Sequence, residues 1–339
     1  MVARTAPRAG GHDDHPPITS VDTTFDTFAR VTTPEDALQA ANERDGVHPG
    51  YRALHAKGTL FKGTFAPTPA AARLSRAAHL RDGPVPLTAR VSNGSGDPGE
   101  PDYAPDVRGL AVKLYLPNGS RTDIVAQSAP RFPVPDPAGF VELLRATTPG
   151  PAMAWRFPLF LARNPRAARD LPSNLATLRP PVSYATLRYY AIHAFKWVDA
   201  EGVASYVRYT LVPEAGEARL TPFEARKRGR DYLRDEMLGR VAREPVRFRL
   251  ELQVGDPHDD VDDPRSVWPD DRERLDGGTI EIVEPDLERE QGDDILVFDP
   301  TRIVDGIELT NDPVLRFRTQ AYSASVLART GVHRPDKLA

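Results

Sequence analysis

The sequence of 339 residues contains no cysteine, which excludes disulfide bonds, thiol catalysis and cysteine-ligated metal centres. It has no apolar run long enough to cross a bilayer, so we expect no membrane partner. Residues 1–17 carry charges but lack the apolar segment of a secretory signal, and this favours a cytoplasmic protein. The net charge of −4 predicts no nucleic-acid partner.

Proline, by contrast, is abundant. The chain has 34 prolines, about twice average usage, which favours long ordered loops over regular structure. Its hydrophobic fraction of 40% and charged fraction of 27% are typical of a globular protein. Because the length fits one large barrel-containing domain, we expect a disordered leader over 1–18 and a single domain over 19–335.

Eight stretches have the apolar, β-branched pattern of strands and are bounded by turn residues. They fall into two groups of four and are joined mostly as hairpins. The stretches are 59–65, 86–91, 109–115, 121–127, 187–198, 203–212, 246–254 and 279–283. This order predicts an α+β protein built on an eight-stranded antiparallel β-barrel with helical additions.

Capping residues and apolar periodicity predict the helices. They are expected over 33–43, 68–80, 136–146, 221–241 and 318–329. The Pro- and Arg-rich segment 147–182 is predicted to be an extended arm, and 284–313 a loop. The acidic loop 256–263 carries His258, but we expect a solvated loop there and not a metal site.

The last predicted helix has an unusual face. At about 100° per residue, Arg318, Tyr322 and Arg329 share one narrow arc. A guanidinium within hydrogen-bond reach of a phenol favours its ionised form, and an ionised tyrosine can ligate haem iron. The alternative is an amphipathic helix with solvated arginines and a half-buried tyrosine, and this stretch alone does not separate the two.

Arg52-Ala-Leu54-His55-Ala56-Lys57-Gly58 resembles the distal-histidine motif of haem catalases. Further segments resemble later landmarks of that family in the same order. They are Arg90-Val-Ser92, Asp106 to Tyr115, Asp123 to Pro130, Asp136-Pro137 with Phe140, His193 to Lys196, Val267-Trp268-Pro269 and Arg318 to Tyr322 with Arg329. The resemblance spans roughly 50–330 and lacks the C-terminal helical domain of long catalases. The chain is therefore similar to the small catalase-related peroxidases.

On the distal side, the resemblance implies that His55 is the general base that moves a proton between the two peroxide oxygens. Ser92 would orient its imidazole ring. Gln127 would hydrogen-bond the peroxide.

On the other side, the resemblance implies a haem b cofactor whose iron is ligated by Tyr322, with Arg318 keeping the phenol ionised. Phe140 would pack on the porphyrin. The haem propionates would be bound by a set of arginines, which guanidinium groups do in a bidentate way. The set is Arg52, Arg90 and Arg329.

Three positions depart from the family pattern. Gln127 replaces an asparagine, Leu54 a small β-branched residue, and Pro133 an aromatic residue. The implied function is a peroxidase with weak catalase activity, which uses hydrogen peroxide or organic hydroperoxides to oxidise a small organic donor. The alternatives are a specialised haem enzyme acting on one organic substrate and a non-catalytic haem-binding protein. Without the C-terminal domain, a monomer or homodimer is expected.

Overall fold

The structure, a computed structural model, describes residues 31–291 and 296–329. The described residues from Thr32 onward belong to one compact unit. The predicted leader over 1–18 lies outside the described residues, and the boundaries of the predicted domain stay a prediction.

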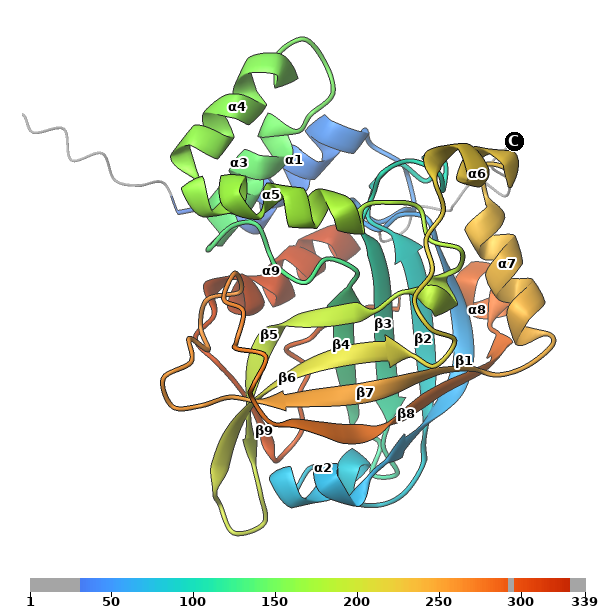
Figure 1. Cartoon of the computed structure of the whole chain (residues 1–339), viewed down its shortest axis with the longest axis vertical. Helices are drawn as coiled ribbons and strands as arrows, with labels where there is room; N and C mark the ends of the chain where they lie inside the picture. Colours follow the sequence, from blue (N-terminus) through green and yellow to red (C-terminus); the bar gives the residue numbers. More distant parts are fainter. Residues whose placement is uncertain (1–30, 292–295, 330–339) are drawn as a thin grey trace, which may run out of the picture. The chain divides into compact units, whose positions relative to one another are not determined.

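Eight antiparallel strands close into a barrel in sequence order (Figure 1). β1 pairs with both β2 and β8, and the pairing of Gln127 with Tyr190 joins β4 to β5. A short ninth strand pairs with the end of β5. The strands are β1 (Gly58–Pro67), β2 (Val85–Asn93), β3 (Arg108–Tyr115), β4 (Arg121–Gln127), β5 (Tyr189–Val198), β6 (Ala204–Pro213), β7 (Val246–Val254), β8 (Arg274–Pro285) and β9 (Ile307–Leu309). The predicted eight-stranded barrel with helical additions is confirmed.

Most of the helices gather at one end of the barrel (Figure 1). α1 packs against α3 and α9, while α4 packs against α3 and α5. The α-helices are α1 (Pro34–Asp45), α2 (Pro69–Leu74), α3 (Pro137–Ala146), α4 (Met153–Arg163), α5 (Pro165–Thr177), α6 (Pro222–Lys227), α7 (Tyr232–Val241), α8 (Leu287–Gln291) and α9 (Pro313–Leu327). Two 3₁₀ turns are η1 (Ala78–Leu80) and η2 (Tyr184–Thr186). No helix in the described ranges is long and apolar enough to span a membrane.

Local sequence signals set several helix starts. Thr33 and Thr221 each form a capping box with the acidic residue three positions on. Asp136 accepts a hydrogen bond from the amide of Gly139 and so caps α3. α3 carries Phe140, so this cap helps fix one wall of the candidate site.

Four local predictions are wrong. The segment 147–182 is not extended, because it contains α4 and α5. Pro165 opens α5, where its missing N–H costs nothing. Pro158 and Pro172 lie inside helices that packing of Phe160 and other apolar side chains stabilises despite the lost bonds.

The helix predicted over 221–241 is divided into α6 and α7, because Gly229 adopts a φ of 101° between them. The helix predicted over 68–80 ends at Leu74 and is followed by η1. The loop predicted over 284–313 contains α8 and β9.

Side chains alternate between the two faces of each barrel strand. Phe61, Phe65, Val91, Leu110 and Val112 belong to the buried core. Because alternation sends neighbouring residues the other way, Ser92 and Gly109 lie on the opposite face from Val91 and Leu110. The candidate site is therefore built on the outer face of β2–β4.

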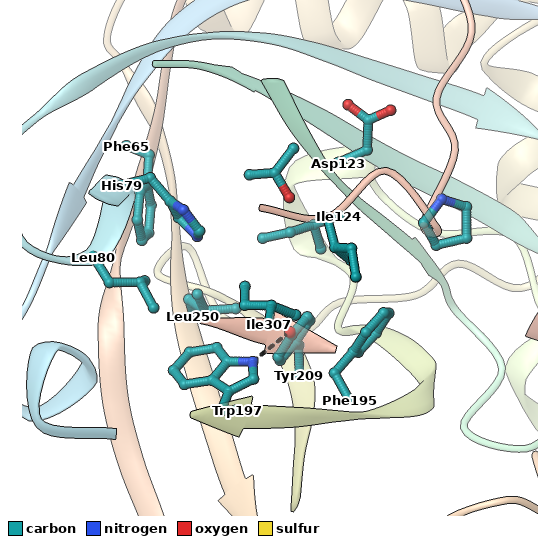
Figure 2. Close-up of a pocket in the computed structure, with 13 residues that line it drawn as sticks. Phe65, His79, Leu80, Asp123, Ile124, Phe195, Trp197, Tyr209, Leu250 and Ile307 are labelled. Carbon is teal, nitrogen blue, oxygen red and sulfur yellow. Dashed lines mark hydrogen bonds between the residues drawn. The ribbon is translucent and has the colours of Figure 1, made fainter. Parts of the chain in front are cut away.

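A small cavity at one end of the barrel is lined by His79 and by buried aromatic side chains (Figure 2). Trp197 Nε1 donates to the hydroxyl of Tyr209 at 2.7 Å. His79 is 4% exposed, and its Nδ1 has no hydrogen-bond partner among the described residues. Burial lowers the pKa of His79 to about 4, so this imidazole is neutral at pH 7.

His79→Phe is expected to reduce the loss of stability in acid. The unfolded histidine titrates near pH 6.5, so the unfolded chain binds one more proton at His79 as the pH falls from about 6.5 to 4. Binding of that proton by the unfolded chain lowers the free energy of unfolding by on the order of 3 kcal/mol between about pH 6.5 and pH 4. Urea unfolding followed at several pH values should show a slope shallower by about one proton in the variant.

His258→Gln is the matched control, because the His258 side chain is 93% exposed. Its Nδ1 lies 2.9 Å from Asp256 Oδ1 and helps to hold the pKa of that carboxyl below its usual range, so the slopes are compared above pH 4. The change in slope there should be smaller than in His79→Phe. An unchanged slope in His79→Phe would show that His79 is not buried as a neutral group.

Candidate active site

Three site residues lie in one row across the sheet. Ser92 of β2 is opposite Gly109 of β3, and Gly109 is opposite Gln127 of β4. Residues in register across neighbouring strands point to the same face, and two strand spacings separate Ser92 from Gln127 by about 10 Å. The barrel thus brings together two polar side chains that are 35 positions apart in the sequence.

His55 lies against this row. Its Nδ1 is 3.1 Å from Ser92 Oγ, which leaves Nε2 as the ring nitrogen not engaged by Ser92. The residue has a φ of 55°, a strained conformation for a residue with a side chain. His55 N donates to the carbonyl of Gly94 at 2.9 Å, and Arg90 Nη2 donates to the carbonyl of His55 at 2.9 Å. Bonds on both sides of the residue therefore maintain the strained backbone.

Gly109 explains how the imidazole ring packs so closely on the sheet. A Cβ at this position would lie 2.8 Å from Ser92 Oγ and 3.0 Å from the ring atoms of His55. Any side chain would push the ring or the serine away.

Burial, together with the positive charges of Arg90, Arg318 and Arg52, lowers the pKa of His55 to about 3. The imidazole is therefore neutral at pH 7 and can accept a proton. Because Arg318 and Arg52 both act on His55, these guanidinium groups lie near the same ring.

Gln127 is held by its own strand end. Its Nε2 donates to the carbonyl of Ala129 at 3.2 Å. One of the two amide N–H groups is thus engaged within the protein, and one remains for a ligand.

A chain of four polar side chains lies on the helical side of the site. Arg318 Nε donates to the hydroxyl of Tyr322 at 2.9 Å, and Arg318 Nη1 is 3.0 Å from His193 Nε2. His193 Nδ1 is 2.7 Å from Asp312 Oδ2. Because a guanidinium only donates, Nε2 of His193 must accept and Nδ1 must carry the proton that Asp312 accepts.

The last two members of this chain, His193 and Asp312, are fixed by the fold. Asp312 also accepts from the amides of Val314 and Leu315, so it caps α9 while it orients His193. Burial lowers the pKa of His193, which keeps the ring neutral. The predicted stripe is therefore only partly formed: Arg318 of α9 contacts Tyr322 and His193. Arg329 lies beyond Leu327, the last residue of α9, so it does not share the helical face.

Sequence reasoning gave no role to His193 or Asp312. In the sequence, His193 is only a landmark of the family resemblance, although a polar residue within the apolar run 187–198 indicates a buried partner. Asp312 before Pro313 has the pattern of a helix cap, which gives no indication of its second partner.

The three arginines predicted to bind carboxylates lie in two different places. Arg52 and Arg329 line one cavity between α1 and the end of α9. Arg90 is instead bonded to the carbonyls of His55 and Ala56. A dianionic group could thus meet two guanidinium groups in one cavity, with the third close to His55.

The remaining walls are apolar. Phe140 is partly buried and lies 5.4 Å from the ring of Phe132, centroid to centroid. A second apolar cluster covers the outer face of the barrel next to the Ser92 row. Its members are Leu60, Ala111, Val125, Leu296 and Phe298.

These residues fit a haem group. A tyrosine hydroxyl beside a guanidinium can ligate iron, apolar walls can contact the ring, and Arg52 with Arg329 can neutralise two carboxylates. Within residues 31–291 and 296–329, no group of three or more histidine, aspartate or glutamate side chains could hold a metal ion.

Known proteins match most of the chain. The family model "Catalase" matches residues 39–336. A "Catalase-related peroxidase" of Mycolicibacterium paratuberculosis is 48% identical over 302 residues, which cover 89% of this chain and 96% of that protein. A second "Catalase-related peroxidase", from Synechococcus elongatus, is 34% identical over 309 residues, which cover 89% of this chain and 90% of that protein. "Catalase-2" of Bacillus subtilis is 29% identical over 83% of this chain but only 44% of its own length.

Proposed function

The chain belongs to the catalase family, and on that premise we propose that it is a haem-dependent peroxidase. It uses hydrogen peroxide or an organic hydroperoxide to oxidise a small organic donor, with weak catalase activity. The names of its two relatives with nearly matching length support this function. The three departures on the distal side, at Gln127, Leu54 and Pro133, support peroxidase over full catalase turnover.

The cofactor we propose is haem b. Tyr322 would ligate the iron, and Arg318 would hold the hydroxyl oxygen of Tyr322 in place through the 2.9 Å hydrogen bond. Arg52, Arg329 and Arg90 would bind the propionates, and Phe140 would pack on the ring. When bound, haem supplies the redox-active iron at which the peroxide O–O bond is cleaved.

The protein's own residues would handle the proton. Neutral His55 accepts it from one peroxide oxygen at Nε2 and returns it to the other oxygen, which leaves as water or an alcohol. Ser92 holds Nδ1, so the ring keeps one orientation through both transfers. Gln127 would hydrogen-bond the peroxide with its remaining N–H.

The observation that carries this proposal is the His55–Ser92 pair. A protein that only stores haem does not require a base that a hydrogen bond keeps in one orientation. The test is to mix the purified holoprotein with hydrogen peroxide while recording the visible spectrum, then to screen organic donors. We expect a rapid spectral change that donors reverse. Absence of a Soret band in haem-supplemented protein would exclude the proposal.

Gln127→Asn is expected to raise oxygen release from peroxide relative to donor oxidation by about fivefold. The shorter asparagine side chain would lose the hydrogen bond to the carbonyl of Ala129. One hydrogen bond contributes about 1 kcal/mol, which corresponds to a change of about fivefold in the ratio. An oxygen electrode and a donor-oxidation assay on the same preparation give the ratio.

Gln253→Asn is the matched control, because Gln253 makes the same kind of bond to the carbonyl of Pro269 outside the site. Its ratio should match the wild type. If Gln127→Asn also leaves the ratio unchanged, Gln127 does not limit catalase activity.

A further inference from the structure

α4 is apolar almost all the way round. Its sequence is Met153-Ala-Trp-Arg-Phe-Pro-Leu-Phe-Leu-Ala-Arg163, in which only Arg156 and Arg163 are polar. A helix of this composition is normally covered on every side. α4 is covered on only one.

The covered side faces the candidate site. Phe160 is 2% exposed and belongs to a cluster with Val134, Ala146 and Ala167. Partly buried side chains of the same cluster are Phe132, Phe140, Leu143, Phe157 and Leu161. α4 therefore forms the outer cover of the aromatic wall that contains Phe140.

The other side is exposed. Trp155 is 59% exposed and Leu159, one turn on, is 39% exposed. Ala154, Pro158 and Ala162 extend the same face and are also exposed. The remaining tryptophans, Trp197 and Trp268, are 1% and 2% exposed.

The charge around this face has one dominant sign. Segment 147–182 contains five arginines and one aspartate, whereas the whole chain has a net charge of −4. Three of these arginines, Arg163, Arg166 and Arg169, lie within 3.4 Å of a carboxylate. Ion pairs at exposed positions contribute little, and these three side chains remain 53% to 70% exposed, so an anionic surface can still reach their guanidinium groups. Arg156 lies over the ring of Trp155 at 5.4 Å, so positive charge directly borders the apolar stripe.

The apolar and cationic side chains together indicate what binds to the exposed face of α4. An exposed tryptophan and leucine beside arginines is the composition of helices that lie in the interface of an anionic bilayer. A second copy of this chain is a poorer match, because a two-fold contact through the stripe would bring Arg156 and Arg163 close to the same residues of the other copy.

We propose that the outer face of α4, formed by Trp155, Leu159 and the flanking Arg156 and Arg163, docks on the surface of anionic membranes. The contact is peripheral and reversible, since α4 rises only about 16 Å along its axis and lies flat in the interface. This revises the expectation of no membrane partner. It does not rest on the haem chemistry proposed above.

The test is co-sedimentation of the holoprotein with vesicles, either pure phosphatidylcholine or containing 30% phosphatidylserine. We expect several-fold stronger binding to the anionic vesicles, weakened by salt. Binding should shift tryptophan emission to the blue, because Trp155 leaves water. Trp155→Ser with Leu159→Ser should lower binding at least tenfold, and Arg156→Gln with Arg163→Gln should remove the preference for anionic lipid.

Phe223→Ser on α6 is the matched control, because Phe223 is 67% exposed but lies outside this face. It should bind like the wild type, and all variants should keep the circular dichroism spectrum and unfolding temperature of the wild type, which shows that they fold. Equal binding of wild type and the Trp155/Leu159 variant would overturn the proposal. So would light scattering that shows a dimer dissociated by that variant without vesicle binding.

Discussion

Tyr322→Phe should lose most of its haem, or bind it with a sharply altered spectrum. The substitution removes only the hydroxyl that accepts the 2.9 Å hydrogen bond from Arg318. Because Tyr322 is half-buried on α9, loss of the oxygen should disturb packing little. The measurement is haem content per chain by pyridine haemochrome, together with the position of the Soret band.

Tyr206→Phe on β6 is the matched control, because Tyr206 is also half-buried but lies outside the site. Its haem content should equal that of the wild type. Haem binding and a spectrum like the wild type in Tyr322→Phe would remove Tyr322 as the iron ligand. Such a result would leave the fold and the family assignment untouched.

The barrel was predictable because strand patterns are local. The alternation in 86–91 and 109–115, with turn residues at their ends, specifies which face is buried. The register that places Ser92, Gly109 and Gln127 in one row is not local, since it depends on which strands pair. Only the family resemblance indicated these side chains as a set before the structure.

Proline misled the prediction between residues 147 and 182. A proline inside a helix costs about 3 kcal/mol in an isolated helix, so the pattern favoured an extended arm. Packing of Phe160 and Ala167 offsets that cost in α4 and α5. The same segment contains the exposed stripe with Trp155, which could be recognised only after the helix was known.

Of the two contacts of Arg318, the sequence predicts one and only the structure shows the other. The helical stripe predicted its contact with Tyr322, which the 2.9 Å bond confirms. Its second contact, with His193 of β5, joins α9 to the barrel across 125 positions of sequence. No periodicity within α9 could indicate that partner, because the partner belongs to another element.

His55→Gln should lower the rate of reaction with peroxide by about 10²- to 10⁴-fold, the usual contribution of a positioned general base. Glutamine keeps polarity and approximate size but cannot accept and return a proton near neutral pH. Haem content should stay close to the wild type, because the groups proposed to bind haem lie elsewhere. Stopped-flow recording of the Soret band after mixing with peroxide gives the rate.

The pH dependence separates a base from a merely structural histidine. Burial and three nearby arginines lower the pKa of His55 to about 3, so the base form persists far below neutrality. The wild-type rate should therefore stay level from about pH 8 to pH 5, with loss of the base only as the pH falls toward 3. His79→Phe, which removes a buried histidine outside the site, should leave both rate and profile unchanged. A His55→Gln rate within threefold of the wild type would rule out proton transfer by His55. The distal residues would then have a role in binding alone.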